Sequence, residues 1–267
     1  MANPVFSRSE TFSRRAPQGY QQPYAQPGYG YDAQPQAYEA PSAPGGVMTL
    51  DDVIAKTGIT LLVVFAAAAA TFVLMPPALL TPALIGSAIV GFITVMFVAA
   101  RRRIPVGGVM FYAAIEGVFV GAFSKYFEYM FPGIVFSAVL ATFIAAGATL
   151  AAYKFFNIRV TTKFRKFVTI ATVAMAGVLL VNFVLALFSV DTGIRGVGSG
   201  AGWLAIGISV LAVGLAVMNL IVDFDFIERG IASRAPAHES WRAAFGVTVT
   251  MVWLYVESLR ILSYFRD

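Results

Sequence analysis

The chain has 267 residues, of which 58% are hydrophobic and 12% charged, and its formal net charge is +5. A soluble domain of this size would carry about a quarter charged residues, so the composition indicates a polytopic membrane protein. The absence of cysteine excludes disulfides and thiolate metal sites, and the single histidine, His238, excludes a metal site with two or more histidine ligands. Membrane topology explains the basic excess, so no nucleic-acid partner is expected.

The first 47 residues are expected to form a disordered cytoplasmic tail ahead of a membrane domain at 48–267. Residues 16–46 are rich in Pro, Gln, Tyr, Gly and Ala, and such a segment buries too little apolar surface to offset its ordering entropy. The tail contains no apolar core of the length that a cleavable signal peptide requires. It is interpreted as a solvated tether, with docking of a partner through its Tyr and Pro residues as the alternative.

Seven apolar stretches follow, each about the length of a bilayer crossing. Thr49 with Asp51 and Asp52 predicts a helix N-terminus that leads into the first stretch, and the Pro76-Pro77 pair predicts its end. The fold class is therefore all-α, a bundle of seven transmembrane helices. The predicted spans are 58–75, 79–100, 106–124, 132–153, 167–190, 203–227 and 243–265.

The distribution of lysine and arginine predicts a multi-pass protein of the cytoplasmic membrane with its N-terminus in the cytoplasm. That orientation places 15 of the 19 basic residues inside, in the tail, in the 101–103 and 154–166 segments and around Arg242. Seven crossings would leave the C-terminus outside. Because Arg260 and Arg266 favour the inner face, the side of the C-terminus stays open.

Four carboxylates lie within or at the ends of these spans, where a charge costs about 2.5 to 3.5 kcal/mol on insertion scales. Asp223 and Asp225 in the sixth span point about 200° apart on a helix, so only one of them can face a given site. The other is expected at the headgroups or beside a basic loop residue.

Glu257 lies deep in the seventh span, three residues before Arg260, which is close enough to be its counter-ion. Glu116 is the most isolated charge of the sequence, with Gly117 and Gly121 forming a small-residue face for another helix. For Glu116, an interhelical hydrogen bond and a role in an ion path are weighed equally. All four acids are candidate ion-path and pH-sensing residues.

Two carboxylates brought close together in a low-dielectric bundle cannot both ionise easily, so they titrate as a unit. Such a pair can share a proton and hold two helices together. After deprotonation it repels itself and can accept a cation such as Ca²⁺, which prefers oxygen ligands. The sequence alone does not show which acids meet.

Two segments resemble the Bax inhibitor-1 family of membrane proteins. Residues 254–259, LYVESL, look like the "LYLDxxN" stretch of its last helix, and residues 222–227, VDFDFI, are similar to the "YDxxxI" stretch of its sixth helix. The seven spans, the basic linker between the fourth and fifth, the tail, the MANPVF opening and the AAIEGVFVGAFS segment resemble a bacterial branch of the family.

This resemblance implies a pH-sensitive acidic latch in a calcium leak pathway, with Asp223 and Glu257 as the latch. The same two acids are the candidate Ca²⁺ ligands. The chain departs from the family pattern in three ways: the second acid is Glu, the acids are 34 residues apart, and the second span has no arginine before Arg101. Arg260 or the basic residues at 101–103 are the candidate replacements for that arginine.

The leading functional hypothesis is a passive, non-enzymatic leak for Ca²⁺ or another cation, gated by protonation of Asp223 and Glu257, with no cofactor other than bound Ca²⁺. The absence of a GxxxxGK[ST] loop fits a passive pathway. The alternative is a membrane scaffold that binds a protease or stress-response protein, with the acids serving helix packing. An intramembrane aspartyl protease is disfavoured because the chain has no GxGD motif. A secondary transporter stays open, although no inverted repeat stands out.

Overall fold

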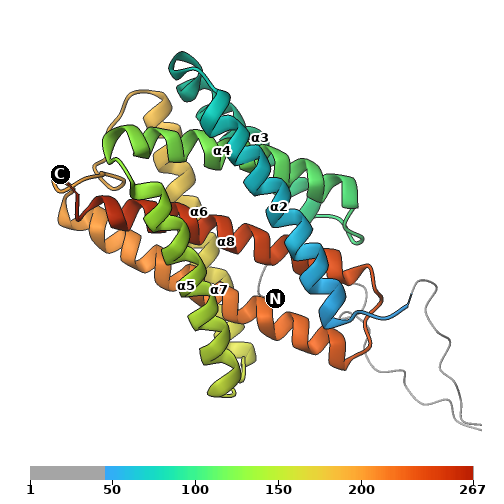
Figure 1. Cartoon of the computed structure of the whole chain (residues 1–267). Coiled ribbons are helices and arrows are strands. Elements are labelled where there is room, and N and C mark those ends of the chain that lie inside the picture. The colour runs from blue at the N-terminus through green and yellow to red at the C-terminus, as the bar shows by residue number, and fades with distance from the viewer. Residues whose placement is uncertain (1–45, 267) are drawn as a thin grey trace, which may run out of the picture.

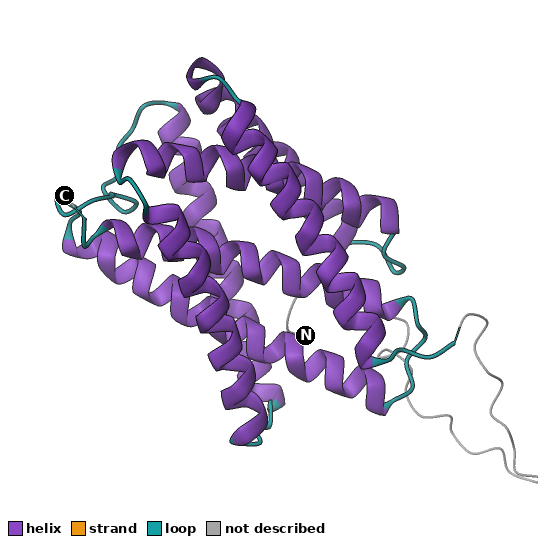
Figure 2. Cartoon of the chain, viewed as in Figure 1, coloured by secondary structure: helices purple, strands orange, loops and turns teal. Residues whose placement is uncertain are grey.

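A computed structural model describes residues 46–266, and within this range it contains helices, turns and loops but no strand (Figure 2). The prediction of an all-α bundle with seven potential membrane spans is confirmed. The helices are α2 (Leu50–Leu74), the short 3₁₀ turn η1 (Pro77–Leu79), α3 (Leu80–Ala99), α4 (Val106–Met130), α5 (Ile134–Phe155), α6 (Thr162–Leu187), α7 (Trp203–Ala232) and α8 (Glu239–Ser263). Residues 1–45 of the expected tail lie outside the described residues.

Several helices extend beyond the apolar stretches that predicted them. The N-cap of α2 is Thr49, whose hydroxyl accepts a hydrogen bond from the backbone N–H of Asp52 at 3.2 Å, and the helix ends before Pro76. Helix α4 continues to Met130, and α6 begins within the basic linker because Thr161 caps it. Apolar composition marks only the part of a helix that lies in hydrocarbon, whereas its polar terminal turns remain helical outside it.

The helices run back and forth between two ends of the bundle, each named here after a buried arginine contact. At the Arg242 end, the start of α2 meets the α7–α8 loop, where Met48 donates its backbone N–H to the Ala235 carbonyl at 2.7 Å. The Arg242 side chain binds the α3–α4 loop at the same end. At the Arg195 end, the α6–α7 loop meets the last turns of α8.

Helix α8 runs through the middle of the bundle, in contact with α2, α4, α5 and α7 (Figure 1). In its most apolar 18-residue stretch, 72% of the residues are buried. Helix α6 lies at the periphery and packs mainly on α7, and none of its corresponding stretch is buried. The buried positions of the fold are therefore concentrated around α8.

Two glycines bring α4 unusually close to α2. A Cβ atom added at Gly117 would lie 2.5 Å from the Val64 carbonyl oxygen, and one at Gly121 would lie 2.4 Å from the Ala68 carbonyl oxygen. No side chain fits at these distances, so the backbones touch directly. The predicted small-residue face is confirmed, and its partner is α2.

Hydroxyl side chains inside the spans are satisfied locally. They donate to the carbonyl four residues earlier in their own helix, which removes the cost of an unpaired donor in an apolar environment. The residues that do so include Thr60, Ser87, Thr94, Ser124, Thr142, Thr149, Thr248 and Ser258. The contact between Ser124 and Tyr255, with 2.6 Å between their hydroxyl oxygens, additionally joins α4 to α8.

Candidate functional site

Asp223 lies in the interface between α7 and α8 and is 1% exposed. Thr250 of α8 donates its hydroxyl hydrogen to Asp223 Oδ2 at 2.7 Å. One turn earlier on α7, the Asn219 side-chain amide donates to the Thr172 hydroxyl of α6 at 2.7 Å. Asp223 thus occupies an apolar, potentially membrane-spanning helix and binds a polar side chain of the central helix.

Glu257 is fully buried in α8 and forms a two-pronged ion pair with Arg195 from the α6–α7 loop. The distances are 2.7 Å from Arg195 Nη2 to Oε1 and 3.2 Å from Nη1 to Oε2. Paired N–H donors of this kind match the geometry of a carboxylate and fix both side chains. The pair therefore fastens the loop to the end of the central helix.

Arg260 is not the ion-pair partner of Glu257, contrary to the sequence-based expectation. Its Nη1 donates to the Arg195 backbone carbonyl at 2.7 Å, and its guanidinium lies 6.0 Å from the centre of the Phe123 ring. The buried Nε of Arg260 has no hydrogen-bond partner in the described part of the chain. Arg260 therefore positions Arg195 while Arg195 neutralises the carboxylate.

The structure assigns Asp223 and Glu257 to separate places rather than to one shared pair. Thr250, which contacts Asp223, precedes Glu257 by seven residues on α8, or about 10 Å along the helix axis. Glu257 in turn contacts Arg195 at the end of the bundle. The interface of the central helix thus holds two acids at two levels, each with its own partner.

Asp225 points away from Asp223 and toward the periphery, as the helical geometry predicted. Its carboxylate pairs with Arg165 of α6 at 2.5 Å and with Arg229 on its own helix at 2.9 Å. Arg229 also donates to the Val160 carbonyl at 2.7 Å, which ties the α5–α6 loop to α7. Asp225 therefore serves as a structural tie between α6 and α7 in this conformation.

Glu116 lies between α4 and α3, apart from the other acids. Tyr112 lies one turn earlier on α4, on the same side of the helix as Glu116. Gly91 of α3 faces Glu116 so closely that an added Cβ would lie 3.1 Å from Oε2. This placement supports the packing role that was weighed for Glu116, since its contacts are with α3 and α4.

A second buried ion pair, which the sequence did not predict, closes the other end of α8. Arg242 and Glu239 are each 1% exposed in their side chains, and 2.9 Å separates Arg242 Nε from Glu239 Oε2. Arg242 Nη2 also donates to the carbonyls of Arg102 at 2.5 Å and Arg101 at 3.2 Å. The sequence pattern Glu-x-x-Arg at 239–242 places these residues one helical turn apart, but the span predicted from apolar length begins only at 243.

The described residues do not form a ready-made metal centre. In residues 46–266, no group of three or more His, Cys, Asp or Glu side chains lies close enough to hold a metal ion. Ca²⁺ takes six to eight oxygen ligands, and the separate positions of Asp223 and Glu257 do not provide a joint site. Asp223 and Thr250 supply oxygen atoms from only two side chains, fewer than a Ca²⁺ centre needs.

Comparison with known proteins places the whole chain in one family. Residues 3–267 match the family described as Bax inhibitor 1 like. No curated protein matches the chain in the corresponding search.

Proposed function

Because the chain belongs to the Bax inhibitor 1-like family, we propose that it is a passive leak for Ca²⁺ or another cation across the cytoplasmic membrane, in which protonation of Asp223 stops the flux and the ion pair of Glu257 holds one end closed. The observation that carries the proposal is the burial of these two carboxylates in adjacent helices that are apolar enough to span a membrane. Ionisable groups in such helices are expensive, and they commonly mark ion or proton pathways.

Basic residues support an orientation with the Arg242 end in the cytoplasm. Within the described residues, this end carries most of the lysine and arginine, including the 101–103 and 154–166 segments and Arg242. The opposite end carries Lys125, Arg195, Arg260 and Arg266. Cytoplasmic loops are enriched in Lys and Arg, so the α6–α7 loop would face the outside.

Asp223 is the proposed cation station inside the membrane. In the protonated state it binds the Thr250 hydroxyl and carries no charge to attract a cation. In the ionised state its carboxylate replaces part of the hydration shell of a cation, together with the hydroxyl of Thr250. Flux is therefore expected to rise as the pH increases from about 6 to about 8.

Glu257 has a different proposed part, because its charge is engaged by Arg195. The guanidinium occupies the position that a cation would need at this carboxylate, and it holds the α6–α7 loop over the end of α8. Neutralising Glu257 releases Arg195, so the α6–α7 loop no longer closes the Arg195 end of the bundle. At the opposite end, the Glu239–Arg242 pair closes the bundle by binding the α3–α4 loop.

Ca²⁺ flux into liposomes that contain the purified protein, at about pH 6 and about pH 8, tests the role of Asp223. Wild type is compared with Asp223→Asn and with Asp225→Asn, which lies two residues away on another face of α7. We expect flux to increase with pH in wild type and in Asp225→Asn, and to lose this response in Asp223→Asn. Folded wild-type protein that passes no Ca²⁺ at either pH would refute the leak and favour the scaffold.

The same assay separates the two acids. Glu257→Gln and Arg195→Gln each remove the ion pair at the end of α8, so both are expected to raise flux at both pH values while the response carried by Asp223 persists. Wild-type flux in both variants would refute the closing role of the ion pair without touching the role of Asp223.

A further inference from the structure

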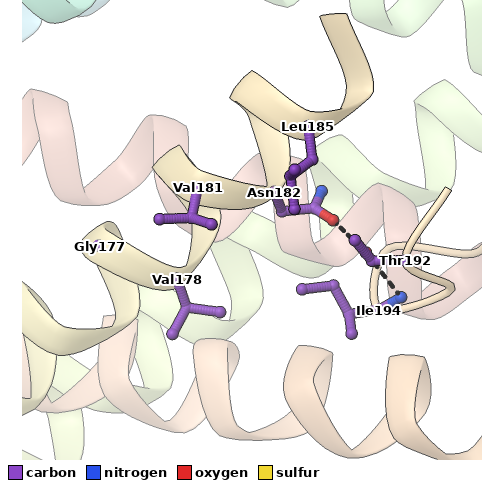
Figure 3. Close-up of a pocket in the computed structure, with 7 residues that line it drawn as sticks. All are labelled: Gly177, Val178, Val181, Asn182, Leu185, Thr192 and Ile194. Atoms are coloured by element: carbon purple, nitrogen blue, oxygen red, sulfur yellow. Dashed lines mark hydrogen bonds between the residues drawn. The ribbon is translucent and has the colours of Figure 1, made fainter. Parts of the chain in front are cut away.

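An open cavity of about 320 Å³ lies between α6 and the α6–α7 loop (Figure 3). One wall is formed by α6, and the other by the first part of the α6–α7 loop, through Thr192 and Ile194. The α6 wall consists of Gly177, Val178, Val181, Asn182 and Leu185. Its size is within the range of small-ligand sites in proteins.

The lining residues of α6 form a narrow stripe along that helix. The α6 residues recur at spacings of one, four, five and eight from Gly177, which keeps them on one side of the helix over roughly 12 Å. Absence of a side chain at Gly177 leaves the stripe open, because a Cβ added there would have no atom within 4 Å in the described structure. The shape suits an extended, linear ligand.

The Asn182 and Thr192 side chains of the cavity bind each other. The Thr192 hydroxyl donates to Asn182 Oδ1, and the same hydroxyl oxygen accepts from the Ile194 backbone N–H at 3.5 Å (Figure 3). The remaining lining is apolar. An occupant gains from burying hydrocarbon against Val178, Val181 and Ile194, and it needs no hydrogen-bonding group at this place.

The apolar surface around the cavity indicates which kind of molecule would fill it. Helix α6 exposes apolar side chains along its length, including Ile170, Val173, Val181 and Val184, so in a membrane this surface faces lipid. The cavity is continuous with it, since Val178 and Val181 belong both to the lining and to the exposed surface. We propose that the cavity binds one acyl chain of a membrane phospholipid, held between α6 and the α6–α7 loop.

This site has a consequence for the loop. Ile194, which would contact the chain, directly precedes Arg195, whose guanidinium pairs with Glu257. A bound acyl chain braces residues 192–194 from the lipid side while the ion pair holds the loop from the bundle side. The lipid site stands on the cavity alone and does not depend on cation flux.

Native mass spectrometry of detergent-purified protein supplemented with dioleoyl phosphatidylethanolamine tests the proposal. The test variant is Gly177→Leu, which fills the stripe without a clash, and the matched control is Gly147→Leu on α5, where an added Cβ also has open space. We expect wild type and Gly147→Leu to retain one more lipid than Gly177→Leu. Exchange of the headgroup for phosphatidylglycerol is expected to leave the retained number unchanged, because the cavity binds the chain.

Equal lipid retention in wild type, Gly147→Leu and Gly177→Leu would overturn the proposal. A second variant, Val181→Trp, fills the same cavity from a position that is 60% exposed and therefore tolerant of size, and it is expected to lose the same lipid. Amide hydrogen exchange of residues 191–196 gives an independent readout. Exchange should be slower with dioleoyl than with dihexanoyl lipid in wild type, and an unchanged rate would refute the bracing of the loop.

Discussion

Helices α6 and α8 are nearly equal in length, with 26 and 25 residues, yet they have opposite environments. The most apolar 18-residue stretch of α6 has a mean hydropathy of 2.4, against 1.4 for that of α8, but α6 lies at the periphery while α8 is the most buried of the seven described spans. In a membrane, apolar side chains are equally well placed against lipid or protein, whereas polar ones need protein partners. The less apolar helix is therefore the one that the bundle encloses.

This difference predicts that arginine is indispensable in α8 and replaceable in α6. Arg242→Met removes the buried partner of Glu239 and should destabilise the protein by about 3–5 kcal/mol, because it leaves a buried charge uncompensated. Arg165→Met on α6 should cost at most about 1 kcal/mol, since Asp225 keeps Arg229 and Arg165 is partly exposed. Unfolding in mixed micelles, followed by tryptophan fluorescence, measures both changes.

The double variant Glu239→Gln/Arg242→Met serves as the control for the first substitution. It removes both charges together, so it should recover much of the stability that Arg242→Met loses. If Arg165→Met proved as damaging as Arg242→Met, the distinction between the two helices would fail for charged residues.

Truncating apolar side chains in α8 and α6 tests the same difference between the two helices, with smaller expected losses of stability. Leu254→Ala in α8 removes a fully buried side chain and should cost about 2–4 kcal/mol through lost packing and a residual cavity. Ile170→Ala in α6 removes a side chain that is 69% exposed, so its effect should stay within about 0.5 kcal/mol. The same unfolding assay compares them, and equal losses would contradict the peripheral position of α6.

Removing one hydroxyl group from each helix should give the smallest difference in stability between α8 and α6. Thr250→Val removes the hydrogen bond to Asp223 and should cost about 0.6–1.7 kcal/mol, from the average to the largest value found for side-chain hydrogen bonds between membrane helices. Thr172→Val on α6 removes the contact with Asn219, which retains its bond to the Leu215 carbonyl, so its cost should fall at or below the lower limit. A larger loss in Thr172→Val than in Thr250→Val would reverse the ranking of the two helices.

The sequence predicted the number and approximate position of the spans because apolar length alone decides whether a helix can cross a bilayer. It also predicted the divergence of Asp223 and Asp225, which follows from helix geometry. It placed Glu257 beside Arg260 because it could weigh only neighbours on one helix. The true counter-ion, Arg195, lies 62 residues away in a glycine-rich loop, and no local spacing predicts how such a loop folds back.

Other contacts of the acids were hidden for a related reason. Thr250 carries no charge and resembles the many hydroxyl residues that bond only to their own helix, so nothing in its sequence context marks it as the partner of Asp223. The low hydropathy of the last span was a usable signal for a central helix, because a helix with so many polar residues needs protein around it. The register between α7 and α8, which decides which acids meet, depends on tertiary packing.

The direct backbone contact at Gly117 and Gly121 sets limits on how this bundle can move. With the carbonyl oxygens of α2 only 2.4 and 2.5 Å from where a Cβ would stand, α2 and α4 have no side-chain layer between them that could rearrange. Sliding of one past the other would lose close packing along the whole seam, so the two helices form one rigid unit. Rearrangement within the bundle would then have to move other helices against the α2–α4 unit, and α6, which packs mainly on α7, is the least enclosed of them.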